Sequence, residues 1–255
     1  MCELMGMNAN VPTDICFSFS GLMKRGGETS HHKDGWGIAF YEGCGCRTFH
    51  DPEPSATSKI AQLISDYPIK SKIIISHIRK ATHGKVNLCN THPFVREMWG
   101  KNWAFAHNGK LPNIKKRKLD HFHPVGDTDS EHAFCWMLDQ IRTQFPKQPR
   151  SRKALAALIQ DLADDIAGGG GIFNFLLSES TDLYAYNTTK LSYLTRRAPF
   201  GEAQLIDDDM VIDFCPETTD TDVVTVIATS PLTNNEDWTA LDHRKLYVFR
   251  DGLIR

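Results

Sequence analysis

The second residue of the chain carries two groups that could act together in catalysis. Removal of Met1, which is generally expected before a small residue, would leave Cys2 with a free α-amino group. An α-amine has a reference pKa of about 7.7–8.0, so it could take the thiol proton directly or through water. Because the thiolate is the attacking form of cysteine, Cys2 is a candidate nucleophile with its own base. On Cys2 alone, coincidence is the better interpretation.

A second polar segment follows an apolar run, residues 73–75, that is typical of a buried strand. It reads His-Ile-Arg-Lys-Ala-Thr-His-Gly at 77–84 and contains Arg79, Thr82 and His83. An arginine can hold a carboxylate through two parallel hydrogen bonds, and the other two side chains can add donors to the same group. The segment therefore predicts a carboxylate-binding site, although a surface ion pair is the commoner role of a single arginine.

Two further segments could complete an amide-cleaving site. His107-Asn108-Gly109 follows a strand-like stretch and is typical of a tight turn, since Asn-Gly accepts positive φ. The alternative is an oxyanion hole, in which the Asn108 side-chain amide and the Gly109 backbone N–H both donate. Asp129 begins a predicted helix, where it would be the N-cap by default. Its carboxylate could also bind the α-ammonium of an amino-acid substrate.

Taken in order, these segments resemble the class II glutamine amidotransferases. The resemblance runs from residue 2 to about residue 250, and five motifs carry it: Cys2 at the start, His-Ile-Arg-Lys-Ala-Thr-His-Gly at 77–84, Asn-Thr-His-Pro at 90–93, His-Asn-Gly at 107–109 and Asp-Ser-Glu at 129–131. Three other stretches are most similar to the stand-alone bacterial YafJ-type amidotransferases: Asp-Gly-Trp-Gly at 34–37, Arg-Arg-Ala-Pro-Phe-Gly at 196–201 and Val-Ile-Ala-Thr-Ser-Pro-Leu-Thr at 226–233.

The resemblance implies an α+β fold, the four-layer αββα sandwich of antiparallel sheets of the N-terminal-nucleophile hydrolases, as a single domain over residues 2–255. It also implies a role for each candidate residue: Cys2 as nucleophile, Asn108 and Gly109 as oxyanion hole, Arg79 with Thr82 and His83 near the glutamine α-carboxylate, Asp129 near the α-ammonium, and Arg25 as a supporting arginine near the nucleophile. Residues 27–33, which follow Arg25, depart from the family's usual compact loop.

The implied reaction is acyl transfer, with glutamine cleaved to glutamate and ammonia through a thioester on Cys2 and with no metal or organic cofactor. Two features differ from the larger synthases: Lys80 stands where they often carry tryptophan, and residues 85–89 lengthen the following loop. Synthases of the family also fuse a second domain that uses the ammonia, and 255 residues leave no room for one.

Three functions therefore compete. The first is a glutaminase that delivers ammonia to a separate synthase subunit. The second is a hydrolase of a γ-glutamyl amide in a larger thiol or peptide. The third is a regulatory module that binds γ-glutamyl compounds without turnover. A Cys-His peptidase using His83 or His92 has no flanking pattern of its own.

The predicted secondary structure places strands first, helices in the middle and strands last, which favours a layered α+β sandwich. Apolar periodicity predicts four helices, over residues 15–25, 55–67, 129–145 and 151–167, the last with Gly168 as its C-cap. Strands are predicted over residues 36–41, 73–75, 103–106, 172–177, 183–186, 191–195, 204–206, 223–228 and 246–249.

Composition and charge narrow the possible functions, partners and compartment further. Lysine plus arginine number 29 against 31 acidic residues, and no basic block occurs, so nucleic acid is not expected as a partner. No signal peptide or transmembrane segment is predicted, and the seven cysteines are scattered and odd in number. We therefore expect a cytoplasmic protein with reduced thiols and no membrane partner. Cys44-Gly45-Cys46 near His31-His32 lacks the usual zinc spacing and is better explained as a turn.

Overall fold

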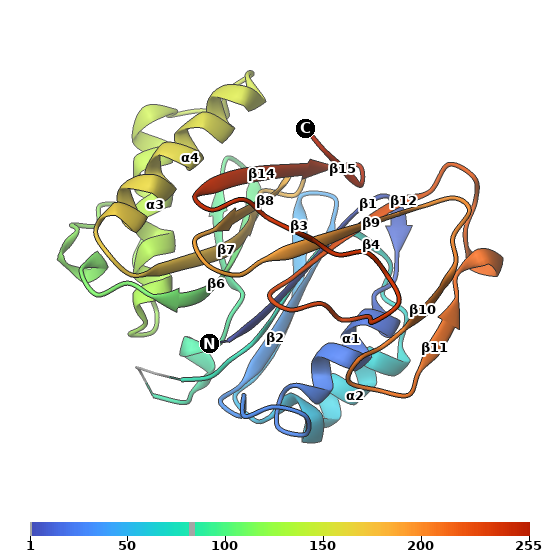
Figure 1. The fold of residues 1–255 in the computed structure, drawn as a ribbon. Helices are drawn as coiled ribbons and strands as arrows, with labels where there is room; N and C mark the ends of the chain where they lie inside the picture. Colours follow the sequence, from blue (N-terminus) through green and yellow to red (C-terminus); the bar gives the residue numbers. More distant parts are fainter. Residues whose placement is uncertain (1, 82–84) are drawn as a thin grey trace.

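The computed structural model describes residues 2–81 and 85–255, and its centre is a pair of stacked antiparallel sheets (Figure 1). The seven-stranded sheet has the spatial order β13 (Thr239–Ala240), β9 (Ser192–Arg197), β12 (Val223–Ala228), β1 (Glu3–Thr13), β4 (Ser71–Ile78), β2 (Trp36–Glu42) and β3 (Gly45–Asp51). The six-stranded sheet has the order β15 (Leu253–Ile254), β14 (Lys245–Arg250), β8 (Leu183–Asn187), β7 (Ile172–Ser178), β6 (Lys101–Lys110) and β5 (Phe94–Met98).

Helices cover the outer face of each sheet, which gives four layers (Figure 1). The α-helices are α1 (Cys16–Lys24) and α2 (Lys59–Asp66) on the seven-stranded sheet, and α3 (Asp129–Gln144) and α4 (Arg152–Gly168) on the six-stranded sheet. Short 3-10 turns occupy Ser55–Thr57, Leu88–Asn90, Ile114–Lys116 and Cys215–Glu217. A separate hairpin, β10 (Glu202–Gln204) and β11 (Val211–Asp213), packs beside α1. This is the predicted αββα arrangement.

Side-chain alternation along the strands explains the layering. In β6, Ala104 and Ala106 face the other sheet, whereas Trp103 and Phe105 pack under α3 and α4. Successive residues of a strand point to opposite faces, so a strand buried on both sides supplies two cores. The core between the sheets combines alanines with aliphatic side chains, and the core under α3 and α4 is rich in aromatic residues.

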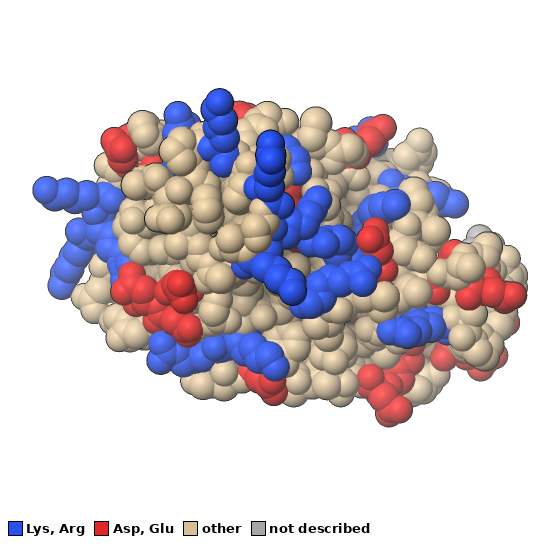
Figure 2. All heavy atoms as spheres, turned by 90° about the horizontal axis from the view of Figure 1, so that it is seen from above, with Lys and Arg blue, Asp and Glu red and all other residues tan. Residues whose placement is uncertain are grey.

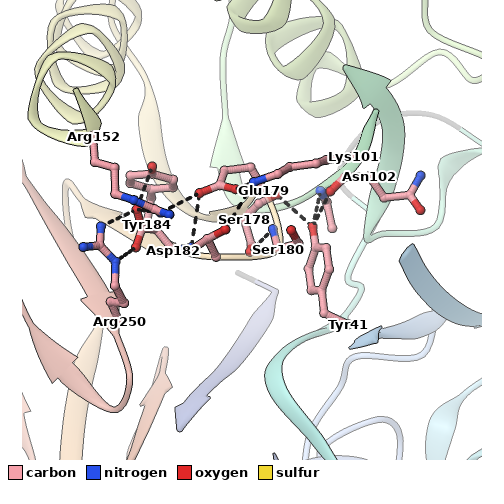
Figure 3. A network of polar contacts seen from close by, with 12 residues as sticks. Tyr41, Lys101, Asn102, Arg152, Ser178, Glu179, Ser180, Asp182, Tyr184 and Arg250 are labelled. Carbon is pink, nitrogen blue, oxygen red and sulfur yellow. Dashed lines mark hydrogen bonds and ion pairs between the residues drawn. The ribbon is translucent and has the colours of Figure 1, made fainter. Parts of the chain in front are cut away.

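A buried network of ion pairs lies at the end of the six-stranded sheet that contains the β7–β8 turn (Figure 3). Glu179 and Asp182 follow β7 and are each about 2% exposed or less. Lys101 lies 3.0 Å from Glu179, Arg152 lies 3.2 Å from Asp182, and Arg250 forms two hydrogen bonds with Asp182. Buried carboxylates need such partners. The network joins α4 and β14 to the β7–β8 turn, at the opposite end of the sheet from Asn108.

Some predicted boundaries were wrong. The helix expected over 55–67 is split, because Ser58 is extended and its side chain accepts a hydrogen bond from the amide of Ala61, which makes Ser58 the N-cap of α2. Gly168 is the last residue of α4, and the C-cap is Gly169. The strand expected over 204–206 lies at 202–204 instead and pairs with β11. The other three predicted helices are confirmed to within two residues at either end.

Candidate active site

Cys2 lies at the start of the central strand of the seven-stranded sheet. Because β1 and β4 pair with Glu3 opposite Ile78, Cys2 is next to the residues that follow β4. Its Sγ accepts a hydrogen bond from the Lys80 amide at 3.2 Å and donates to the Lys80 carbonyl at 3.4 Å. Burial raises the pKa of the thiol, against the lowering effects of that amide and of Arg79. The thiol therefore needs a base to react near neutral pH.

Asn108 joins Cys2 from the other sheet. The tight turn expected at 107–109 was wrong, because these residues continue β6 and Asn108 pairs with Asn174 of β7. The Asn108 Nδ2 atom donates to the Cys2 carbonyl oxygen and, at 3.3 Å, to the Thr229 hydroxyl. Its Oδ1 is buried without a hydrogen-bond partner among the described residues. The side-chain amide thus lies directly against the backbone of Cys2.

The backbone geometry at position 109 requires a glycine. Its φ is 156°, and a Cβ at this position would lie 1.9 Å from the carbonyl oxygen of Ile172. Any side chain would therefore push β6 away from β7 next to Asn108. The glycine keeps the backbone close to the neighbouring strand at the point where an oxyanion donor was predicted.

Arg25 supports the segment next to Cys2. It is 6% exposed and makes ion pairs with Glu3 at 3.0 Å and Asp207 at 2.7 Å. The same guanidinium donates to the carbonyl oxygens of Ser230 and Pro231. Arginine can fix several acceptors at once through its planar fork. These contacts hold together the start of β1, the end of α1 and the segment after β12.

Arg79 is buried beside the loop that follows β4. Its Nη1 donates to the Lys85 carbonyl at 3.0 Å, and Asp34 accepts a hydrogen bond from the Ala81 amide at 2.7 Å. Burial lowers the pKa of Arg79, with Cys2 and Asp34 acting in the opposite direction. An arginine stays charged at neutral pH, so a positive charge lies close to Cys2. Thr82 and His83, also predicted for this site, lie outside the described residues.

Asp129 is not the N-cap of α3, contrary to the default expectation. Thr128 is extended and accepts a hydrogen bond from the Glu131 amide, which makes it the cap. The half-buried Asp129 carboxylate instead accepts from the Ser130 amide at 3.0 Å and from the Leu111 amide at 2.7 Å, just beyond the end of β6. A carboxylate has further lone pairs, so these bonds leave room for an ammonium ligand.

Sequence reasoning missed the residues that brace the loop after β4. Asn90 is fully buried, donates to Asp127 at 2.6 Å and to the Lys85 carbonyl at 3.0 Å, and accepts from the Asp127 amide at 2.9 Å. The Lys85 carbonyl is therefore shared by Asn90 and Arg79. Asn90 stands in the Asn-Thr-His-Pro motif, which was a signal without an assigned role.

Thr229 was also missed, although it lies in the motif at 226–233. Its hydroxyl accepts from the Leu4 amide at 2.9 Å and contacts the Asn108 amide. Its own amide donates to the Leu4 carbonyl at 3.0 Å. Thr229 thus fixes the residues after Cys2 relative to Asn108.

Comparisons with known proteins identify the family of the chain. The family model of the class II glutamine amidotransferases matches residues 1–255. The chain belongs to this family. It is 58% identical over 238 residues to the Escherichia coli protein YafJ, which is provisionally named a glutamine amidotransferase, with 93% of each chain covered. A Haemophilus influenzae protein with a similar provisional name is 49% identical over 253 residues, covering 99% of this chain and 85% of the relative.

Solved structures place this amidotransferase in the same fold. A crystal structure of a predicted glutamine amidotransferase from Pseudomonas aeruginosa is 45% identical, has a TM-score of 0.78 and covers 99% of both chains. The glutamine phosphoribosylpyrophosphate amidotransferase of Bacillus subtilis is 15% identical with a TM-score of 0.53, over all of this chain and 48% of that one. The second likeness shows the fold alone. The fold predicted for an N-terminal-nucleophile hydrolase is confirmed.

Three buried histidines lie behind the active-site strands of the amidotransferase. The His77 and His92 rings stack with centroids 4.2 Å apart, and His92 also stacks on Phe94 at 4.3 Å. His107 is bonded to the Ser130 hydroxyl at 2.8 Å. Burial lowers the pKa of all three, that of His77 to about 3. No hydrogen bond joins His92 to Cys2 in the described part of the chain, which gives no support to a Cys-His peptidase.

These histidines predict loss of stability in acid. Between pH 6.5 and about 3 the unfolded chain binds protons at His77 that the folded chain does not bind, so the free energy of unfolding falls as pH falls. The slope from one such group reaches about 1.4 kcal/mol per pH unit. Denaturant titrations across this range should show a shallower slope for His77→Gln than for the native chain. The exposed His121→Gln is the control, and equal slopes for His77→Gln and the native chain would contradict this account.

The described residues of the amidotransferase form neither a metal cluster nor a membrane-spanning helix. Over residues 2–81 and 85–255, no group of three or more His, Cys, Asp or Glu side chains is arranged to hold a metal ion. Cys44 precedes β3 at the turn from β2, and the Cys46 amide is bonded to Asn102. None of the helices in the described chain is long and apolar enough to cross a membrane.

Proposed function

We propose that this amidotransferase hydrolyses the side-chain amide of glutamine to glutamate and ammonia through a thioester on Cys2. The observation that carries the proposal is the contact between Cys2 and the Asn108 amide at the meeting point of the two sheets. In this proposal Arg79, whose charge acts on Cys2, supplies the cation, and Asp129, which is bonded just beyond the end of β6, supplies the carboxylate. This is the charge pattern that the α-carboxylate and α-ammonium of a γ-glutamyl group require.

The proposed reaction starts with removal of Met1, which leaves Cys2 with a free α-amine. The amine takes the thiol proton, and the sulfur attacks the amide carbon. Asn108 then exchanges its contact with Thr229 for the oxygen of the tetrahedral intermediate, together with the Gly109 amide. The protonated amine gives its proton to the departing ammonia. Water next attacks the thioester, releasing glutamate and restoring the thiol.

Arg79 is proposed to bind the substrate carboxylate through two hydrogen bonds. Arg79→Lys should raise KM for glutamine about 10–100-fold, because hydrogen bonds to charged groups contribute about 1.5–3 kcal/mol, while kcat changes less. For a γ-glutamyl substrate whose α-carboxylate is blocked as an amide, Arg79→Lys should change KM only slightly. Steady-state kinetics on both substrates measures this, with the exposed Arg47→Lys as control. An equal effect on the two substrates would contradict the assignment.

A panel of amides tests the substrate. We expect ammonia from free glutamine, measured against γ-glutamyl methylamide, γ-glutamylcysteine and asparagine. Faster cleavage of γ-glutamylcysteine than of glutamine would favour the second function, hydrolysis of a larger γ-glutamyl compound. Binding without turnover of any of them would favour a regulatory module and overturn the proposal.

Partner and compartment follow from the same proposal. A glutaminase that releases ammonia fits a separate synthase subunit that uses it, as in the family's fused enzymes. All seven cysteines are free thiols in the structure, which suits a reducing compartment such as the cytoplasm. Co-purification under reducing conditions, with glutaminase activity followed in each fraction, tests both.

A further inference from the structure

A cavity lies along the half of β1 that is farther from Cys2. Its volume is about 340 Å³, and it is enclosed by the end of β1, the start of α1 and the β10–β11 hairpin. Met7 and Val11 line the cavity five and nine residues from Cys2, and at about 3.3 Å per residue of strand they lie about 17 Å and about 30 Å away. The cavity is therefore separate from the amidotransferase site.

Apolar side chains from three elements line one part of the cavity, and serine, threonine and charged side chains line the rest. Met7 and Val226 line it from the seven-stranded sheet, Ile15 and Phe17 from the α1 side, and Ile212 and Phe214 from the hairpin side. Phe17 and Phe214 meet edge to face with ring centroids 5.5 Å apart. The volume is at the lower end of the range for small-molecule sites. An apolar body of this size would displace water from both the sheet and the hairpin.

Carboxylates dominate the rim. Asp14, Asp66 and Asp222 line the opening, together with Lys70, a cation that forms no ion pair within residues 2–81 and 85–255. The other basic lining residue, Arg196, forms two 2.7 Å hydrogen bonds with Glu236. The rim therefore has an excess of negative charge.

The segment of the chain around the rim is also negatively charged. Residues 198–222, which include the hairpin, contain eight acidic residues and no lysine or arginine. Figure 2 shows several acidic side chains at the right-hand end of the face that it displays. Asp207 and Asp208 are partly neutralised by Arg25 and Lys24, whereas no ion pair engages Asp14, Asp66 or Asp222 in the described part of the chain. The local field favours a cation and opposes an anion.

We propose that this cavity binds a small amphipathic amine. The apolar body lies between Met7, Phe17 and Phe214, and the ammonium group lies at the rim beside Asp14 and Asp66. Burial of the body supplies affinity, and the carboxylates discriminate against neutral and anionic ligands of the same length. The site is independent of the reaction at Cys2.

Titration calorimetry of the full chain with n-octylammonium, 1-octanol and octanoate tests the proposal. Octylammonium should bind saturably in the micromolar to low millimolar range, and octanoate at least tenfold more weakly. The double variant Asp14→Asn, Asp66→Asn should weaken octylammonium about three- to tenfold and leave octanol unchanged. The Asp14→Asn side chain keeps an oxygen that can accept the Cys16 amide, so α1 retains its start.

Two further variants complete the design. Val11→Trp fills the cavity from a half-buried position and should abolish binding of all three probes, and Asp161→Asn on the exposed face of α4 is the matched charge control. The double asparagine variant decides the question if Val11→Trp fails to fold. The proposal is overturned if octanoate binds as tightly as octylammonium, if the double variant binds like the native chain, or if octylammonium shows no saturable binding.

Discussion

Cys2→Ala is expected to lose about 10⁴–10⁶-fold in glutamine turnover, because the proposed thioester forms on the Cys2 sulfur. The substitution should leave folding intact, since Cys2 is half-buried and the hydrogen bonds of its thiol within the described part of the chain go to the backbone of Lys80. Initial rates of ammonia release, with thermal unfolding of each protein, measure both effects.

Cys44→Ala is the matched control, because Cys44 is an exposed thiol at the turn between β2 and β3. It should keep full activity. A Cys2→Ala protein that retains near-native turnover would show that the nucleophile is another residue, whatever the state of Met1.

Asn108→Ala is expected to lower kcat about 10²–10³-fold with a smaller change in KM. The loss of an oxyanion donor costs roughly 3–4 kcal/mol in the transition state, and the ground-state carbonyl gains less from the same bond. The variant should also unfold more readily by about 1–3 kcal/mol, since Asn108 is fully buried and bonded to Cys2 and Thr229.

Asn108→Asp separates the two effects. It keeps the size of the side chain but replaces the Nδ2 donor with a second acceptor oxygen, so it should lose turnover as Asn108→Ala does. Single-turnover rates with denaturant titration distinguish catalysis from stability. An effect confined to KM, or to stability alone, would contradict the oxyanion role.

The long helices could be predicted from sequence because their signals are local. In α3, Phe134, Met137, Leu138 and Ile141 repeat at helical spacing and are all buried. The N-cap expected at Asp129 was wrong, because the cap is Thr128, which is extended and whose side chain accepts from the Glu131 amide.

The central strand β1 could not be predicted from its own residues, because polar and small residues interrupt its pattern. Asn8 accepts a hydrogen bond from the Gly252 amide, and Asn10 accepts one from Val223. These partners lie more than 200 residues away, so nothing local marks Asn8 or Asn10 as strand positions. Only the family resemblance implied a strand behind Cys2.

In the candidate site, too, local sequence signals identified some features and long-range contacts determined the others. The motifs identified Cys2, Asn108 and Arg79, but the Asn-Gly pair favoured a turn over the observed strand. Asn108 lies in β6 because it pairs with Asn174, whose side chain also donates to the Asn108 carbonyl at 3.2 Å. Long-range pairing overrides a local turn preference in this case.

Intact-mass spectrometry before and after treatment with 6-diazo-5-oxo-norleucine, followed by peptide mapping, tests the central claim most directly. The reagent carries the α-carboxylate and α-ammonium of glutamine, so labelling requires both the γ-glutamyl pocket and the nucleophile. We predict a chain that has lost Met1 and gains a single adduct, mapped to Cys2. A processed chain without an adduct, or an adduct on another cysteine, would contradict the claim.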